Sequence, residues 1–405
     1  MRWLPTLDKG MSEARSKGIS STSGGVSRRF ALAYRQDWDE DRAMVEAFRR
    51  VTWVYRAVDA IASNVGRVPF VVRRGDMYDG EEVESSLLRI FNSKPNVGED
   101  AFAFKYRLSS QLLLSSKGAF IEVLRSIGGD VIGLQLLPPK FVTPIKDPVN
   151  FVKRYELRVP ASVTENKKPV NRDLPADSVV WIRKPHPFDP YGAITPLDAA
   201  GVAVETDWLA KIYNRNFLLN DGRPGGMVIL KGDISEEDKD ELRARFRGGP
   251  GSAGRISIIA AENGADFVDT AVNPRDAQYI EGRKATKEEI LIAFGVPETV
   301  LANAAGRTFD NAEIERLIFW QETMMPHLEL VTRPLDVLEG EGDDNYVGYD
   351  VSRVDVLQRA EIKRREFMLR EFDTGAIVAD EYRDGTGRDP YATAEDGTHP
   401  GQVIW

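Results

Sequence analysis

The stretch TPLDAAGVAVETDWLAKIYNRNFLLNDGRPGG, residues 195–226, carries clear signals for the start and the end of a helix. Thr195 is a typical N-cap, Pro196 suits the first helical position and Asp198 is acidic at the third. Residues that form turns end the pattern: Asn220, Asp221, Gly222 and Pro224. The sequence predicts one helix of about 25 residues, roughly 37 Å long at 1.5 Å per residue.

A second helix with similar boundaries follows further along the chain. Asn273 is its expected N-cap with Pro274 at the first position, and Gly295 with Pro297 closes it after roughly 30 Å. The polar stretch 281–284 lies between apolar ends, so we expect it to be solvated, as it would be beside a water-filled lumen. Two long helices around a small insert predict a stalk-like hairpin.

The insert between these helices combines short apolar and charged segments. It contains the apolar run Met227–Leu230, a charged helix Ser235–Arg247 and an apolar strand Arg255–Ala260. Its glycines Gly249, Gly251 and Gly254 match the spacing of a dinucleotide-binding turn. That motif needs a strand before the glycines and a helix after them, and the order here is reversed, so we interpret them as a surface loop.

Four arginines make this insert locally basic: Arg243, Arg245, Arg247 and Arg255. They could contact phosphates or an acidic protein partner, or they could form a solvated helix face, because five carboxylates interleave with them. Docking of a partner through charge pairs fits the alternation best.

The rest of the chain indicates an α+β fold. Residues 1–28 are rich in serine, glycine and charge, which predicts a mobile arm. Helices are expected at 39–64, 100–115, 310–325, 354–371 and 380–385, with a kink at Pro326. Strands are expected at 68–73, 119–125, 131–137, 153–158 and 178–183.

Composition excludes several classes of protein. Hydrophobic residues make up 42% of the 405 residues and charged residues 29%, as in folded soluble chains. No apolar run is long enough for a membrane span and no secretory signal is present, so we expect a cytoplasmic protein with no membrane partner. Cysteine is absent, which excludes thiol chemistry, and the net charge of -9 argues against tight nucleic-acid binding.

Residue types suited to catalysis are sparse. The three histidines are His186, His327 and His399, each beside a proline and far apart in sequence, which favours turn or surface positions over metal binding. Acidic pairs such as Glu236 with Glu237 are typical of solvated faces. We therefore predict no catalytic residue, no cofactor and no metal.

Short motifs distributed in order along the chain resemble the portal protein family of tailed double-stranded DNA phages, in its siphophage form. The motifs are Trp53–Ala62, Leu136–Pro139, Asn220–Gly226, Gly254–Arg255, Ala293–Pro297, Thr308–Asn311, Met325–His327, and Gly375 with Glu381 and Arg383. They extend from about Trp53 to Pro390. No single motif is decisive, but their order and spacing together are specific.

The resemblance implies an architecture of wing, stem, clip and crown. It implies a flexible arm at 1–28, an α+β wing at 29–194, a descending stem helix at 195–225, a clip at 226–272, an ascending stem helix at 273–297, a tunnel loop at 298–310, a kinked helix with further wing at 311–353, and a crown with tail at 354–405. Two long stem helices, a small α/β clip and a helical crown would follow.

The resemblance also implies a function. Such a chain would form a closed ring, commonly of twelve subunits, at one vertex of the virion capsid, as a conduit for DNA packaging and ejection. Its partners would be further copies of itself, the large terminase subunit, the major capsid or scaffold protein, the head-tail connector, and double-stranded DNA passing without sequence specificity. Assembly would occur in the host cytoplasm, and the ring itself would not be an enzyme.

The resemblance implies three sets of contact residues. The tunnel-loop set is Asn303, Arg307 and Thr308; the channel face of the stem is Arg283, Lys284 and Lys287; and partner docking on the clip falls to Arg243, Arg245, Arg247 and Arg255. A metal-dependent DNA-processing enzyme and another capsid connector or scaffold component are the alternatives. A portal from a gene transfer agent would have the same sequence features.

Overall fold

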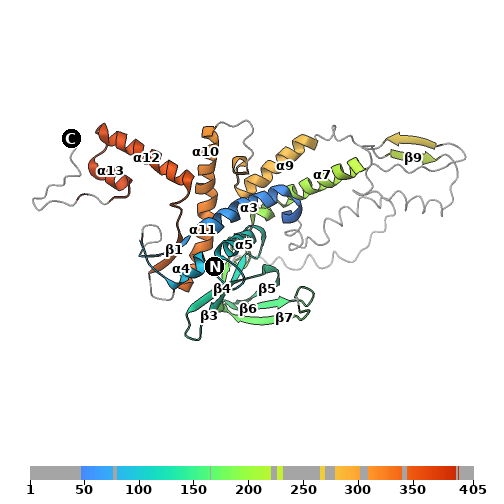
Figure 1. Cartoon of the computed structure of the whole chain (residues 1–405). Helices are drawn as coiled ribbons and strands as arrows, with labels where there is room; N and C mark the ends of the chain where they lie inside the picture. Colours follow the sequence, from blue (N-terminus) through green and yellow to red (C-terminus); the bar gives the residue numbers. More distant parts are fainter. Residues whose placement is uncertain are drawn as a thin grey trace, which may run out of the picture. The chain divides into compact units, whose positions relative to one another are not determined.

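The computed structural model describes residues 47–75, 80–164, 166–219, 226–230, 265–269, 279–301, 309–339, 344–388 and 391. Within these ranges it is a mixed helix-and-sheet protein (Figure 1). The predicted arm at 1–28, the charged helix and the glycine loop of the insert lie outside the described residues.

The main hydrophobic core forms around helix α3 (Thr52–Arg67). Six of its residues are buried, namely Val54, Ala57, Val58, Ile61, Ala62 and Val65, whereas Tyr55 is exposed. Helix α5 (Ala101–Leu114) packs against α3. Asp100 and Ser115 cap α5 at the bounds that the sequence predicts, with Asp100 Oδ1 accepting from the Ala103 N–H at 2.7 Å.

A three-stranded sheet continues this core. Strand β3 (Ala119–Arg125) lies between β4 (Val131–Leu137) and β8 (Val179–Ile182), both antiparallel to it. The structure confirms the predicted bounds of β3 and β4. It adds helix α4 (Ser86–Asn92), which the sequence did not predict, with Ser85 as its N-cap.

A second sheet packs on one side of β3. It has the order β5 (Val142–Asp147), β6 (Phe151–Val159), β7 (Val170–Pro175), so β5 and β7 are its edges. Its core comprises Phe120, Leu137, Val142, Val152, Tyr155, Leu157, Leu174 and Val179. Only the middle strand of this sheet was predicted from the sequence, because it alone alternates clearly.

The first predicted stalk helix is interrupted in the structure. The Thr195 capping box is present, but it starts only the short helix α6 (Pro196–Ala199). Ala200 then has φ −88° and ψ 4°, and helix α7 (Gly201–Leu219) follows. The prediction of one continuous helix is therefore wrong at Ala200, where a ψ of 4° leaves the helical range.

The chain runs out along α7 and returns along α9 (Tyr279–Phe294), and the two helices pack against each other (Figure 1). Between α7 and α9 in the sequence, strands β9 (Gly226–Leu230) and β10 (Ala265–Asp269) pair antiparallel. β9 corresponds to the predicted apolar run at Met227–Leu230. The expected N-cap of the second helix, Asn273, lies outside the described residues.

The C-terminal part begins with a bent helical column. Helix α10 (Phe309–Ile318) leads into a π-helical segment (Phe319–Met324), then α11 (Met325–Thr332) and a 3₁₀ segment (Arg333–Leu338). Strand β11 (Asn345–Tyr349) then pairs with β1 (Phe70–Arg74), which also pairs with the short β2 (Glu81–Glu82). β11 was not predicted.

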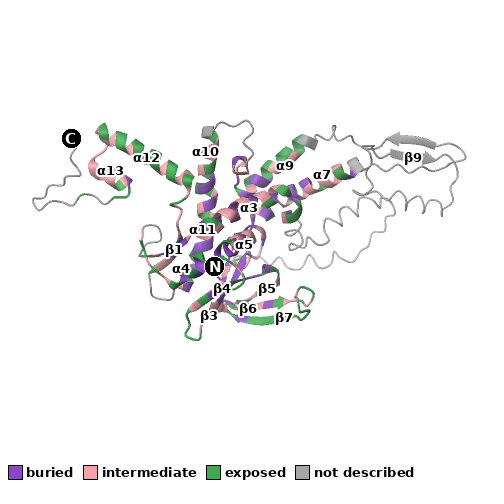
Figure 2. Ribbon diagram, in the orientation of Figure 1, coloured by how far each residue is buried: buried purple, intermediate pink, exposed green. Residues whose placement is uncertain are grey.

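Two further helices complete the described chain. Helix α12 (Asp355–Asp373) contains no buried residue, and α13 (Ala379–Gly385) packs against it, with Phe372 stacked on Tyr382 at 5.4 Å (Figure 2). Gly375, just after α12, has φ +72°.

Candidate functional site: the paired helices and their ion pairs

The end of α9 is fixed by backbone geometry. Gly295 has φ +66°, and the Val296 N–H donates to Leu291 O while the Gly295 N–H donates to Ile292 O, both at 3.0 Å. This pair of bonds is the Schellman ending, which places glycine in the left-handed region. Thr323 Oγ1 also donates to Gly295 O at 2.7 Å. The turn after α9 is thereby attached to the π-helical segment.

A buried carboxylate joins α7 to α9. The Asp207 side chain is completely buried, and its Oδ2 lies 2.6 Å from Lys211 Nζ, one turn along α7. Its Oδ1 lies 3.4 Å from both Nε and Nη2 of Arg283 on α9. A buried charge is tolerated when cations compensate it, so this cluster fixes the two helices relative to each other.

A second ion pair lies one helical turn beyond Arg283. Lys287 Nζ pairs with Glu298 in the 3₁₀ segment Glu298–Leu301 and lies 5.4 Å from the centre of the Trp53 ring of α3. Thr299 is buried and donates to Glu315 Oε2 on α10 at 2.8 Å. These contacts hold the start of the connection between α9 and α10 against the core.

The structure separates the residues that were predicted together on the stem. Lys284 is exposed, whereas Arg283 and Lys287 turn toward ion-pair partners within the chain. Asn303, Arg307 and Thr308, predicted on the tunnel loop, lie outside the described residues, as do Arg243, Arg245, Arg247 and Arg255 of the insert. Sequence reasoning identified the charged positions of α9 but missed Asp207, their buried counterpart.

At the predicted kink the structure has a π-helical segment. The Met325 N–H donates to Trp320 O, five residues back, directly before Pro326. Proline has no N–H and its ring displaces the carbonyl of the preceding turn, so a wider turn in front of it relieves the conflict. Phe319 and Met324 anchor this segment in the core.

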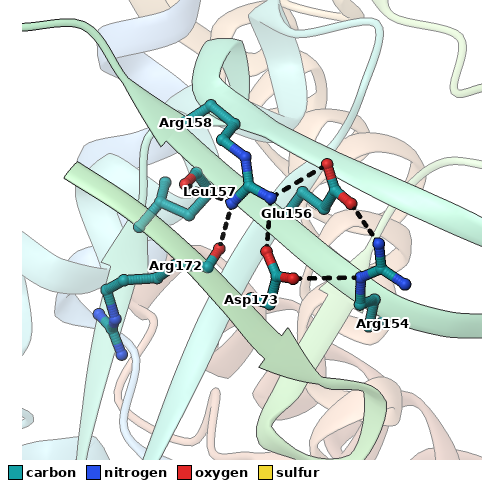
Figure 3. Close-up of polar contacts among 6 residues, drawn as sticks. All are labelled: Arg154, Glu156, Leu157, Arg158, Arg172 and Asp173. Carbon is teal, nitrogen blue, oxygen red and sulfur yellow. Dashed lines mark hydrogen bonds and ion pairs between the residues drawn. The ribbon is translucent and has the colours of Figure 1, made fainter. Parts of the chain in front are cut away.

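Charged side chains form a network on the exposed face of β6 and β7 (Figure 3). Arg158 Nη2 lies 2.5 Å from Asp173 Oδ1 and 3.3 Å from Glu156 Oε2, and Arg154 bridges the same two carboxylates from the other side. Arg172 pairs through both terminal nitrogens with Glu122, a buried carboxylate on β3. The network ties the second sheet together and to the first.

Two buried basic groups were not recognised in the sequence. His327 was expected at a turn or on the surface, but its Nε2 lies 2.7 Å from Ser109 Oγ on α5, and desolvation lowers the pKa of its imidazole to about 4. Desolvation also lowers the pKa of the Lys105 ammonium to about 8, although Nζ donates to Val68 O at 2.8 Å. By contrast, His186 is in a turn as expected, where Nδ1 accepts from the Asp189 N–H at 3.0 Å.

The described part of the chain lacks two kinds of feature. Among these residues, no group of three or more histidine, aspartate or glutamate side chains is arranged to hold a metal ion. None of the described helices has both the length and the apolar character needed to cross a bilayer.

Comparison with known families accounts for this arrangement. The family described as "Phage portal protein" matches residues 52–387, from the first residue of α3 to just past the end of α13. The chain belongs to the phage portal protein family. The resemblance inferred from the short motifs is confirmed.

Two curated proteins match parts of this chain. A protein of Rickettsia felis is 26% identical over 293 residues, covering 71% of this chain and 74% of that protein. A "Probable portal protein" of Streptomyces phage phiC31 is 25% identical over 195 residues, covering 47% of this chain and 42% of that protein.

The fold is also similar to that of a solved chain. In a structure described as "Neck of native GTA particle computed with C12 symmetry", one chain aligns with a TM-score of 0.61 and 23% identity, over 87% of this chain and 94% of that one. GTA stands for gene transfer agent. The mixed helix-and-sheet fold of this chain is therefore that of a known neck component.

Proposed function

We propose that this chain is one subunit of a closed ring in the neck of a phage or gene transfer agent particle, through which double-stranded DNA passes. The match of the portal family to residues 52–387 carries this proposal. The similar neck chain, which aligns over most of both chains, supports it. The paired helices α7 and α9 form an elongated element of the kind that a channel wall requires.

Twelve is the proposed ring number. The similar neck structure was computed with C12 symmetry, and a closed ring of identical subunits uses heterologous contacts, in which one face of each copy meets a different face of the next. Within each subunit, α7 and α9 would form the stem, β9 and β10 part of the clip, and α12 and α13 part of the crown. The segment from Glu298 to Asp310 would form the tunnel loop.

The contacts with DNA would be weak and few. Of the three cations predicted on the channel face of the stem, Lys284 is exposed. Arg283 and Lys287 instead pair with Asp207 and Glu298. Each phosphate contact releases counterions and so increases affinity, which would hinder sliding. Arg307, with Asn303 and Thr308, would contribute a single belt of charge where the tunnel loops meet.

The ring would act without catalysis of its own. We propose that the arginines of the insert bind the terminase motor during packaging and the head-tail connector afterwards, and that the wing contacts the major capsid or scaffold protein. The subunits would assemble in the host cytoplasm and remain in the virion.

The first test is the mass and symmetry of the purified full chain. Native mass spectrometry and negative-stain imaging should show a ring of twelve copies with a central hole, and parallel assays should detect neither ATP hydrolysis nor DNA cleavage. A stable monomer or dimer that cleaves DNA with a divalent metal would contradict the proposal.

A further inference from the structure

The connection between β8 and α6 is a loop with several internal constraints. Three of its residues are prolines, whose rings fix the backbone φ: Pro185, Pro187 and Pro190. His186 caps the turn, because its Nδ1 accepts from the Phe188 N–H at 3.2 Å and from the Asp189 N–H at 3.0 Å. A side chain at the tip of such a constrained loop loses little conformational freedom when it binds a partner.

The tip of this loop presents an uncovered aromatic ring. Phe188 is 91% exposed, and Val149, in the turn between β5 and β6, is 86% exposed. Tyr191 joins the two segments, because its ring stacks on that of Phe151 at 4.4 Å and its hydroxyl donates to Phe151 O at 3.0 Å. The two segments together form the Phe188 surface, which comprises residues 146–153 and 183–191.

One residue of the Phe188 surface has an unfavourable backbone conformation. Phe151 has φ +65°, in the left-handed region that residues with a Cβ rarely adopt. Its ring stacks on Tyr191 and also on Trp181 at 6.3 Å, and Arg183 Cζ lies 4.0 Å from the centre of the Trp181 ring. Strained residues persist where the surrounding contacts hold them, and they are concentrated at functional sites.

Cations outnumber carboxylates on the Phe188 surface. The cations are Lys146, Lys153, Arg183 and Lys184, and the carboxylates are Asp147 and Asp189. Both carboxylates accept from N–H groups of their own turns, Asp147 Oδ1 from Val149 at 2.8 Å and Asp189 Oδ1 from Tyr191 at 2.9 Å. The neighbouring network on β6 and β7 pairs its charges internally (Figure 3). In a chain of net charge -9, this surface is therefore locally basic and attracts acidic groups.

We propose that the Phe188 surface binds an acidic segment of a partner protein that also carries an apolar side chain. This inference rests on the proposed function, in which the ring docks other proteins of the particle. The excess of positive charge selects carboxylates, and Phe188 with Val149 provides the apolar contact at which water is displaced. The constrained loop holds Phe188 ready for that contact.

The arrangement of the rings favours a protein partner over a nucleic acid. Bases that stack on a protein need free ring faces, but Phe151 and Tyr191 stack on each other, and Lys146 Nζ lies 4.4 Å from the centre of the Tyr191 ring. Duplex DNA would contact the cations and leave Phe188 in water. A segment with both carboxylates and an apolar side chain would use the cations and Phe188 together.

The direct test measures binding of a labelled peptide to the full chain by fluorescence anisotropy. The probe is a short peptide in which a phenylalanine and a leucine are flanked by glutamates. One matched peptide has lysine in place of each glutamate, and another has serine in place of both apolar residues. The chain should bind the probe at least about tenfold more tightly than either matched peptide, because charge and apolar burial both contribute.

Two variants of the chain should weaken binding of the probe. Phe188→Ser and Lys184→Glu should each do so by roughly tenfold, because one removes the apolar contact and the other reverses a charge. Ile127→Ser and Lys94→Glu are the matched controls, since both residues are exposed and lie outside the Phe188 surface, and they should bind like the wild type. Circular dichroism should be unchanged in all four. Equal affinity of Phe188→Ser and the wild type would overturn the inference, as would equal affinity for the glutamate and lysine peptides.

His186 tests whether the shape of the loop contributes. His186→Ala removes the acceptor of two backbone N–H groups and should weaken binding of the probe. His186→Asn retains an oxygen that can accept from the same groups, so it should bind more tightly than His186→Ala. Unchanged binding by His186→Ala would contradict the argument that a constrained loop presents Phe188.

Failure of this inference is distinguishable from failure of the proposed function. A wild-type chain that forms rings in mass photometry but does not bind the probe overturns the inference and leaves the ring. A chain that binds the probe but never forms a ring has the opposite meaning. If Phe188→Ser loses ring assembly, the surface contacts a second copy instead, and if it loses binding of DNA but not of the probe, the surface contacts nucleic acid; either result overturns the acidic partner.

Discussion

Helices α3 and α12 have similar lengths but very different surroundings. Six residues of α3 are buried in the core, whereas none of the nineteen residues of α12 is buried. Apolar residues on α3 are covered by the subunit's own chain, while Ile362 and Phe367 of α12 are left in water. The contrast separates a helix that the subunit's own core covers from one whose apolar side chains the subunit leaves accessible.

The largest expected effect compares the same substitution in both helices. Ile61→Ala should reduce the free energy of unfolding by about 2–5 kcal/mol, because it leaves a cavity in a packed core. Ile362→Ala should change that of the isolated subunit by less than about 0.5 kcal/mol, because the site is exposed. Urea unfolding at a protein concentration low enough to keep the chain monomeric measures both, and equal losses would remove the contrast.

Lowering the pH should reduce the stability of the folded core. Burial lowers the pKa of His327 from 6.5 to about 4, so the unfolded chain binds more protons than the folded chain between those values. Stability should therefore fall as the pH decreases from about 6.5 to about 4, by up to about 3 kcal/mol from this group. His327→Gln cannot titrate, so its stability should fall less over this range; parallel curves would contradict the assignment.

The junction of α7 and α9 should have an intermediate effect. Asp207→Ala leaves Arg283 and Lys211 without their buried counterion and should cost about 1–3 kcal/mol of unfolding free energy, less than for fully buried partners because both cations are partly accessible. Glu361→Ala removes the exposed pairs with Arg364 and Arg365 on α12 and should cost at most about 0.5 kcal/mol. Thermal unfolding of the two variants checks the difference.

A glycine within α9 and the glycine that ends the helix should respond in opposite directions. At Gly295 the φ of +66° and a position for Cβ only 2.5 Å from Thr323 Oγ1 make alanine unfavourable, so Gly295→Ala should destabilise by about 1–2 kcal/mol. At Gly282, in the exposed helix interior, nothing lies within 4 Å of a new Cβ, and alanine should stabilise by about 0.5–1 kcal/mol. Changes of the same sign would contradict the helix ending described for α9.

The sequence predicted helix ends that are set by capping residues close to them in the chain. The bounds of α5 follow from its caps, and the end of α9 follows from Gly295, because capping bonds form between residues close in sequence. Strand β7 was missed because its pattern is weak, and β11 because its partner is also distant in sequence; β11 pairs with β1 through contacts such as Phe70 with Tyr349. The break at Ala200 was missed because one glycine is compatible with a continuous helical pattern.

The sequence predicted charged residues of the candidate site on α9, but not the residues with which they pair. The sequence places Arg283, Lys284 and Lys287 near one another on a helix, yet only the packing of α7 on α9 shows that Asp207 engages the first of them. Lys287 likewise pairs with a residue beyond the end of its own helix. Which cations remain exposed depends on these tertiary contacts.

The charged network on the second sheet has a further consequence for the proposed ring. Strand β7 is an open edge, and open edges can add strands from other molecules and so begin aggregation. Arg172 and Asp173 place charge along this edge, and Pro175 has no N–H to offer at its end. Crowding of many subunits at one place can thus proceed without their sheets joining edge to edge.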